Sequence, residues 1–267
     1  KITVEVPVNK VELNKKTLNL EKGSNEKLIA TIDPTDATRK DIVWSSNANE
    51  VASVSSDGVV TAKKNGIAII TATVDGKSVD CTVNVSTSVQ SVSLNKTTVT
   101  LENGKTTELV ATVNPVDATY DKIEWTSSDK SIATVVDGVV TAKKNGKATI
   151  TATVGGKSAS ATVQVITLID KFEISKSSIS IVKGKTYQLE TTISPSDTTE
   201  SKVVTWESAN KNIATVDKNG VVTGVSKGTT KITGKLENGK TVTCDVEVTI
   251  IPVDSISFEN RVVDALK

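Results

Sequence analysis

The sequence of 267 residues predicts an all-β protein made of three tandem two-sheet β-sandwich domains. Three observations lead to this prediction. Long stretches of sequence recur three times, glycine-containing turn pairs separate short apolar runs, and apolar and polar residues alternate within those runs. About seven short strands in each copy of ~80 residues are typical of a sandwich of two sheets.

The repeat is visible first in the tryptophans, since Trp44, Trp125 and Trp206 are each 81 residues apart. The segment DGVVTAKKNG occupies 57–66 and again 137–146, and NGVVTGVSKG occupies 219–228. A proline precedes each tryptophan and a turn glycine follows it: Pro34, Pro115, Pro195, Gly58, Gly138 and Gly220. Internal repetition of this kind overrides the domain count that length alone suggests.

Each strand is predicted from the turn that ends it and from its period of two. Asp57-Gly58 and its counterparts are Asx-Gly pairs between apolar runs, which predict tight hairpins with positive φ at both residues. Later pairs, of which Asp75-Gly76 is the first, predict the last hairpin of each copy. Strict alternation, as in Val79, Cys81, Val83 and Val85, predicts strands with one buried and one solvated face. An apolar residue two positions before each tryptophan places the indole on the inward face, as a structural core residue.

Composition excludes several classes of function. The 32 Lys and Arg residues nearly balance the 31 Asp and Glu residues, so the chain has no electrostatic footprint for nucleic acid. No apolar stretch is long enough to span a bilayer, and we predict no membrane insertion. The chain has no histidine, which removes the commonest general base and metal ligand. We therefore predict a protein that is not an enzyme, with no catalytic residues and no cofactor.

Several motifs resemble the bacterial immunoglobulin-like domains of group 2. They are the V-x-L-N-K opening, the W-x-S-S/A segment, the G-V-V-T-A/G core and the closing G-x-A-x-I-T-A-T-V hairpin, and they span about residues 8–250. The third copy departs slightly, with Gly224 and Gly234 in place of alanines. The resemblance implies three Ig-like sandwiches forming an extended rod, in a spacer or adhesion module of an intimin- or invasin-type surface protein or of a phage structural protein. It leaves the ligand open, because fold and function separate easily.

We place the repeat boundaries at short linkers that leave almost no flexible spacer. The expected segments are the end of a preceding repeat or a linker at 1–7, domains at 8–86, 87–167 and 168–250, and an incomplete fourth repeat at 251–267. On this reading the chain is a slice of a longer array. A second hypothesis is that such an orphan end strand pairs with a neighbouring molecule, so that the chain self-associates.

A few residues are candidates for a binding role. Aspartates in or beside the loop that carries the proline are weak candidates for a metal: Asp33, Asp36, Asp117 and Asp197. Calcium needs six to eight oxygens, so we expect an Asx turn there and no metal site. Tyr120 aligns with Arg39 and Glu200, which predicts an exposed side chain that could contact a partner. Cys81 and Cys244 occupy equivalent inward positions and are expected to be free thiols.

The function that fits these observations is a non-catalytic extracellular stalk or adhesion module on the cell surface or in the cell wall. The alternative is a structural component of a phage virion or extracellular filament, and a third hypothesis is an accessory domain of a cell-wall enzyme. The partner would be a protein or a cell-envelope glycan, and its identity stays open at this point.

Overall fold

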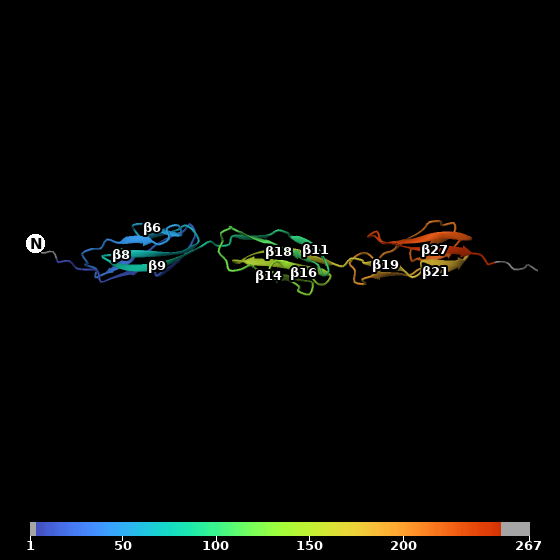
Figure 1. Cartoon of the computed structure of the whole chain (residues 1–267), viewed down its shortest axis with the longest axis horizontal. Coiled ribbons are helices and arrows are strands. Elements are labelled where there is room, and N and C mark those ends of the chain that lie inside the picture. Colours follow the sequence, from blue (N-terminus) through green and yellow to red (C-terminus); the bar gives the residue numbers. More distant parts are fainter. Residues whose placement is uncertain (1–3, 252–267) are drawn as a thin grey trace, which may run out of the picture. The chain divides into compact units, whose positions relative to one another are not determined.

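The computed structural model describes residues 4–251, and every regular element in that range is a β-strand (Figure 1). The first repeat comprises β1 (Lys10–Leu13), β2 (Thr17–Glu21), β3 (Asn25–Lys27), β4 (Ala30–Asp33), β5 (Val43–Ser46), β6 (Ala52–Val54), β7 (Val59–Ala62), β8 (Gly66–Val74) and β9 (Lys77–Ser86). The second comprises β10 (Ser91–Leu94), β11 (Thr98–Glu102), β12 (Thr106–Glu108), β13 (Ala111–Asn114), β14 (Glu124–Ser127), β15 (Ala133–Val136), β16 (Val139–Ala142), β17 (Gly146–Val154) and β18 (Lys157–Ile166). The third comprises β19 (Lys171–Ile174), β20 (Ser178–Val182), β21 (Thr186–Gln188), β22 (Thr191–Ser194), β23 (Thr205–Ser208), β24 (Ala214–Val216), β25 (Val221–Gly224), β26 (Gly228–Lys235) and β27 (Thr241–Thr249).

The strands of each repeat form the same set of sheets. In the first repeat, β1 pairs with β4, a four-stranded sheet has the order β2-β9-β8-β5, and a three-stranded sheet has the order β3-β7-β6. The other two repeats reproduce this topology strand for strand. Most pairs are antiparallel, but β2 runs parallel to β9 and β20 runs parallel to β27. The predicted tandem of three all-β domains is therefore confirmed.

The core lies between the four-stranded and three-stranded sheets. In the first repeat it joins Ile70 and Val83 of the larger sheet to Val60 of the smaller one, and all three side chains are fully buried. On β8 the buried positions alternate with exposed ones such as Ile67, as the period of two predicts. Burying a side chain of this size stabilises the fold by roughly 1.5–3 kcal/mol.

The tryptophans lie at the edge of this core and are half-buried. Trp44 on β5 packs against the buried cluster of the first repeat, and Trp206 does so in the third. The indole of Trp44 also covers the turn at Gly58, where a Cβ would lie 2.9 Å from its Cζ2 atom. Gly58 has a φ of +85°, so this turn requires glycine both for its backbone conformation and for the space beside the ring.

Of the Asx-Gly pairs at 57–58, 137–138 and 219–220, only the one in the second repeat forms the expected tight hairpin, whereas the later pair Asp75-Gly76 does form a two-residue turn with positive φ at both residues. In the second repeat, Asp137 and Gly138 both have positive φ and form a two-residue connection between β15 and β16. The corresponding connections in the first and third repeats, 55–58 and 217–220, have four residues, and only their glycines have positive φ. In the first of these, the Ser55 hydroxyl accepts a hydrogen bond from the Val59 N–H and donates one to the Asp57 carboxylate, which closes the longer loop.

The described residues divide into two compact units, one ending at Gln164 and the other beginning at Val165. The first unit holds the first two repeats as far as Gln164 of β18, and the second holds the end of β18 and the third repeat. Apart from residues 4–7 and Ile251, the segments expected to belong to further repeats, 1–7 and 251–267, lie outside the described residues. Between residues 4 and 251 there is no helix of the length and apolarity needed to cross a membrane.

Candidate functional site

The segment that connects the first two repeats is held by side chains from both of them. We call the contact formed by Glu21, Lys22, Asn65, Thr87, Ser88 and Asp117 the joint. Thr87 lies at its centre and is only 8% exposed. Its hydroxyl donates to Asn65 Oδ1 of the first repeat at 2.7 Å, and its carbonyl accepts from the Thr119 N–H of the second at 2.7 Å. The linker residue is thus fixed to both neighbours.

A carboxylate from the end of β2 holds the residue that follows Thr87. Glu21 accepts two hydrogen bonds from Ser88, one from its N–H at 2.6 Å and one from its hydroxyl at 2.9 Å. The two carboxylate oxygens of Glu21 thus hold both the backbone and the side chain of Ser88. Since Ser88 lies in the short segment between β9 and β10, the bond pair sets the direction in which the chain leaves the first repeat.

The third element of the joint is an ion pair that crosses between the repeats. Lys22 Nζ lies 2.6 Å from Asp117 Oδ2, and the Asn65 amide donates to the Asp117 carbonyl oxygen. The hydrogen bond from Lys22 holds the pKa of the Asp117 carboxyl below its ordinary value, and the charge of Lys22 adds to this effect. Both side chains remain partly in solvent, so the pair orients the repeats more than it stabilises them.

A backbone clamp recurs where the chain enters each repeat. The Thr87 N–H donates to the Thr119 hydroxyl at 3.3 Å, while the Thr119 N–H donates back to the Thr87 carbonyl. The same reciprocal pair joins Val6 to Thr38 and Thr167 to Thr199. Each repeat therefore holds its own opening segment against the loop that follows its proline.

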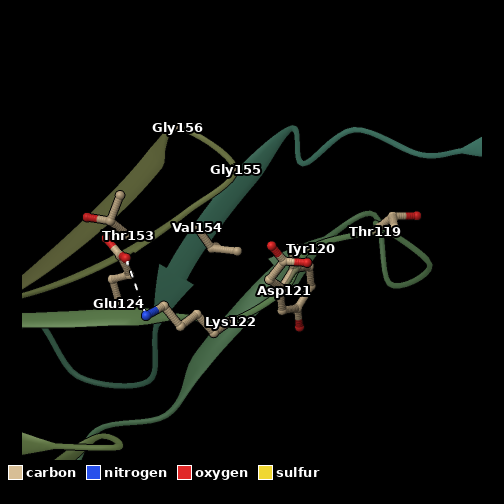
Figure 2. A pocket seen from close by; sticks show the side chains of 9 residues that line it. All are labelled: Thr119, Tyr120, Asp121, Lys122, Glu124, Thr153, Val154, Gly155 and Gly156. Carbon is tan, nitrogen blue, oxygen red and sulfur yellow. Dashed lines mark ion pairs between the residues drawn. The ribbon is translucent and has the colours of Figure 1, made fainter. Parts of the chain in front are cut away.

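Next to this clamp the second repeat has a hollow of about 480 Å³, which we call the Tyr120 hollow. It lies between the loop 119–122 and the hairpin turn Gly155-Gly156, with Glu124 and Thr153 along its floor. Figure 2 shows Lys122 reaching to Glu124, an ion pair of 3.7 Å, while the glycine turn carries no side chain. Tyr120 is 42% exposed, which agrees with its predicted position at the surface.

The aspartates considered as metal ligands do not come together. In the described part of the chain, no group of three or more acidic or cysteine side chains could hold a metal ion. Asp33 ends β4 with an exposed side chain, Asp36 is exposed in the following loop, and Asp117 is paired with Lys22. Asp197 is the counterpart of Asp117 in the third repeat. Asp117 therefore takes part in a contact between the first two repeats.

The two cysteines are free and fully buried, as expected from their inward positions on β9 and β27. Burial raises the pKa of both the Cys81 and the Cys244 thiol. Because the thiolate is the reactive form, these side chains act as small apolar residues of the core.

Sequence reasoning missed the joint, apart from noting that the linkers are short. Glu21, Lys22 and Asn65 read as ordinary polar residues of strand ends and turns. One signal was available, since a threonine recurs at Thr38, Thr119 and Thr199 although its neighbours vary. A polar residue that recurs in every copy of a loop indicates a structural hydrogen bond, which here is the clamp.

Comparison with known proteins gives one family along nearly the whole chain. The model of the bacterial Ig-like domain (group 2) matches residues 7–83, 88–165 and 169–246. The three matches correspond to the three repeats of the structure.

Three relatives illustrate where such repeats occur. An uncharacterised protein of Clostridium acetobutylicum is 36% identical over 168 residues, which are 60% of this chain and 17% of that protein. Ice-binding protein 1 of Shewanella frigidimarina is 30% identical over 229 residues, which are 80% of this chain and 26% of that protein. An Ig-like virion protein of Serratia phage KSP90 is 34% identical over 169 residues, which are 60% of this chain and 65% of that protein. The chain therefore spans less than two thirds of each relative's length.

Proposed function

The chain belongs to the bacterial Ig-like domain (group 2) family, and on that premise we propose that it is a non-catalytic stalk segment of an extracellular surface protein. The family fold is typical of modules that position other domains. A stalk must hold its modules at defined angles, and free rotation at each linker would defeat it. The observation that carries the proposal is the joint, because it ties a buried linker residue to both repeats.

The joint suits a spacer for a physical reason. Consecutive repeats contact only their neighbours in such arrays, so stiffness depends on each linker and on the groups beside it. Here the four residues between β9 and β10 are restrained by the Thr87, Ser88 and Asp117 contacts together, which leaves little freedom for bending. These contacts are hydrogen bonds and an ion pair that are partly exposed to solvent, so they restrict the orientation of the two repeats without requiring a large apolar interface.

The test is whether the first two repeats tumble as one body in the intact chain. Residual dipolar couplings measured in a weakly aligning medium give an alignment tensor for each repeat. Equal tensors are expected in the unaltered chain. In the double variant Glu21→Gln, Asp117→Asn, the magnitude of the alignment tensor of one repeat should fall relative to that of the other, because the linker becomes mobile.

A matched control is Glu12→Gln, which removes the Lys10–Glu12 ion pair inside the first repeat and away from the joint. It should leave the tensors equal. Unequal tensors in the unaltered chain would show that the repeats move independently, and the stiff-stalk proposal would then be abandoned.

A second candidate function is a structural component of a virion, favoured by the similarity to the Ig-like virion protein. The two functions differ in where the chain resides. An antibody raised against the chain would detect it in washed envelopes of the source cells if it is a surface stalk, and in density-purified phage particles if it is a virion component. Detection only in the soluble cytoplasmic fraction would exclude both.

A further inference from the structure

We propose that the second repeat binds a neutral saccharide in the Tyr120 hollow, with one pyranose ring stacked on the Tyr120 side chain. This goes beyond the stalk function and does not depend on it, since the site would exist wherever the chain is displayed. It adds a binding activity to one repeat of three, and the contrast between the repeats is the first part of the argument.

The position that Tyr120 occupies is closed by internal polar bonds in the other repeats. In the first, Arg39 lies 3.7 Å from Asp75 of the hairpin turn and 3.4 Å from Glu5. In the third, Glu200 accepts hydrogen bonds from Asn238 of the turn, at 3.2 and 3.3 Å, and from the Ile169 N–H. Both repeats thus use this residue to connect the loop to the hairpin.

The second repeat replaces that connection with an open space. Its turn residues are Gly155 and Gly156, so no side chain reaches from the turn toward the loop. A Cβ on Gly156 would meet nothing within 4 Å. The resulting hollow of about 480 Å³ compares with about 230 Å³ at the same place in the third repeat. Within residues 4–251, the side chains of Tyr120 and Asp121 form no hydrogen bond or ion pair.

The groups around this space match the surface of a sugar ring. A pyranose has a face of C–H groups, which packs on an aromatic ring, and a rim of hydroxyls, which need donors and acceptors. Tyr120 supplies the ring and a phenolic hydroxyl. Asp121 supplies an acceptor carboxylate, and Lys122 and Glu124 supply a donor and a further acceptor across the floor. A few polar groups around one aromatic anchor are typical of small-ligand sites.

The charges indicate which sugars fit. Two carboxylates and one ammonium group line the hollow, which leaves a net charge of −1 among Asp121, Lys122 and Glu124. A uronic or sialic acid would be repelled, whereas a neutral pyranose would meet only hydrogen-bonding partners. The occupant we propose is therefore an uncharged oligosaccharide.

The site is held in place before any ligand arrives. Thr119, directly before Tyr120, is fixed by the clamp to Thr87. On the other wall, Gly155 is backed by the buried Val89, whose Cβ would lie 2.7 Å from a Cβ at Gly155. Both walls belong to ordered elements, so binding orders little additional chain. One aromatic contact in a shallow hollow predicts millimolar affinity.

The test is a titration of the intact 15N-labelled chain, followed by amide chemical shifts. The probes are chitotetraose and cellotetraose as neutral saccharides and tri-galacturonate as the anionic comparison. Saturable shifts are expected at residues 119–122 and 155–156 with at least one neutral probe, and none with the anionic one.

Variants separate the site from general effects. Tyr120→Ala should raise the dissociation constant of the saccharide by about tenfold or more, since it removes the stacked ring. Tyr120→Phe, which keeps the ring and the fold, should stay within a few-fold of the unaltered chain. The matched control is Arg39→Ala, which changes the equivalent loop position of the first repeat and should not alter binding.

Two results would overturn the proposal. The first is the absence of shifts with both neutral probes at tens of millimolar, or equal shifts in Tyr120→Ala. The second is a response only to a proline-rich peptide, since proline also packs on aromatic side chains. That response would assign the hollow to a protein partner instead.

Discussion

Replacing Gly58 with alanine tests the packing between the indole and the turn, because the chain contains a matched glycine. Gly58 has a φ of +85° and Gly23, in the same repeat, has a φ of +87°. A Cβ at position 58 would lie 2.6 Å from the Leu28 carbonyl oxygen and 2.9 Å from Trp44 Cζ2, whereas a Cβ at position 23 would meet nothing within 4 Å. Gly23→Ala therefore carries only the backbone strain.

The expected magnitudes follow from that difference. Left-handed backbone at a non-glycine residue costs about 1–2 kcal/mol, and this cost applies to both variants. Gly58→Ala adds an overpacking cost of about 1–3 kcal/mol. The surroundings yield poorly, because Leu28 is 1% exposed and its N–H donates to the Gly58 carbonyl at 2.9 Å. Relief of the clash would displace that buried residue or the indole.

Native-state amide hydrogen exchange measures the free energy of unfolding of one repeat within the intact chain. The slowest amides of β8 and β9 should exchange about 5- to 150-fold faster in Gly58→Ala than in Gly23→Ala, since each 1.4 kcal/mol is about tenfold. Amides of the third repeat serve as the internal reference and should not change. Equal exchange rates in the two variants would refute the packing role assigned to Gly58.

Three further predictions concern the joint and the core. Lowering the pH should loosen the joint, because Lys22 depresses the pKa of Asp117 in the folded state; the attraction between the two side chains is present at neutral pH and is lost as the pH falls through that depressed pKa. Dipolar couplings recorded across that pH range should show the first two repeats becoming mobile relative to each other. Asp117→Asn should abolish the part of the pH dependence that comes from this ion pair. Thr87→Val should keep the shape of the linker but lose the bond to Asn65, lowering stability by about 1 kcal/mol at the joint in hydrogen exchange, and unchanged protection would contradict a role for that hydroxyl. Cys81→Ala should be tolerated better than Cys81→Ser, because the serine buries a hydroxyl at a cost of about 1–3 kcal/mol. In the unaltered native chain, Ellman's reagent should label neither thiol, and rapid labelling would contradict their burial.

The core could be predicted from the sequence because alternation determines it locally. Cys81 and Val83 were placed inward by the period of two, and both are fully buried. The turn at 57–58 could not be predicted to the residue. The first copy has one residue more than the second between the tryptophan and the Asx-Gly pair, which makes a four-residue loop, and the Ser55 hydroxyl then closes that loop.

The joint could not be predicted because its partners are far apart in the chain. Glu21 and Ser88 are 67 residues apart, and Lys22 and Asp117 are 95 apart. A repeat pattern states which residues are equivalent, but it does not state which end of one copy meets the next. The exposure of Tyr120 was predictable by alignment with Arg39 and Glu200. The hollow beside it was not, because it depends on the Gly155-Gly156 turn lying next to the loop that carries Tyr120.

The parallel pairing of β2 with β9 determines how a repeat carries tension. When a repeat is pulled by its two ends, β2 is drawn toward its amino end and β9 toward its carboxyl end. Because the strands run in the same direction, these forces oppose each other along one ladder, and the residue pairs from Thr17–Thr82 to Glu21–Ser86 resist together in shear. The antiparallel β8–β9 hairpin, loaded at its open end, would instead separate one pair at a time. The third repeat has the same parallel pair, between β20 and β27, so both repeats resist extension along the chain by the same geometry.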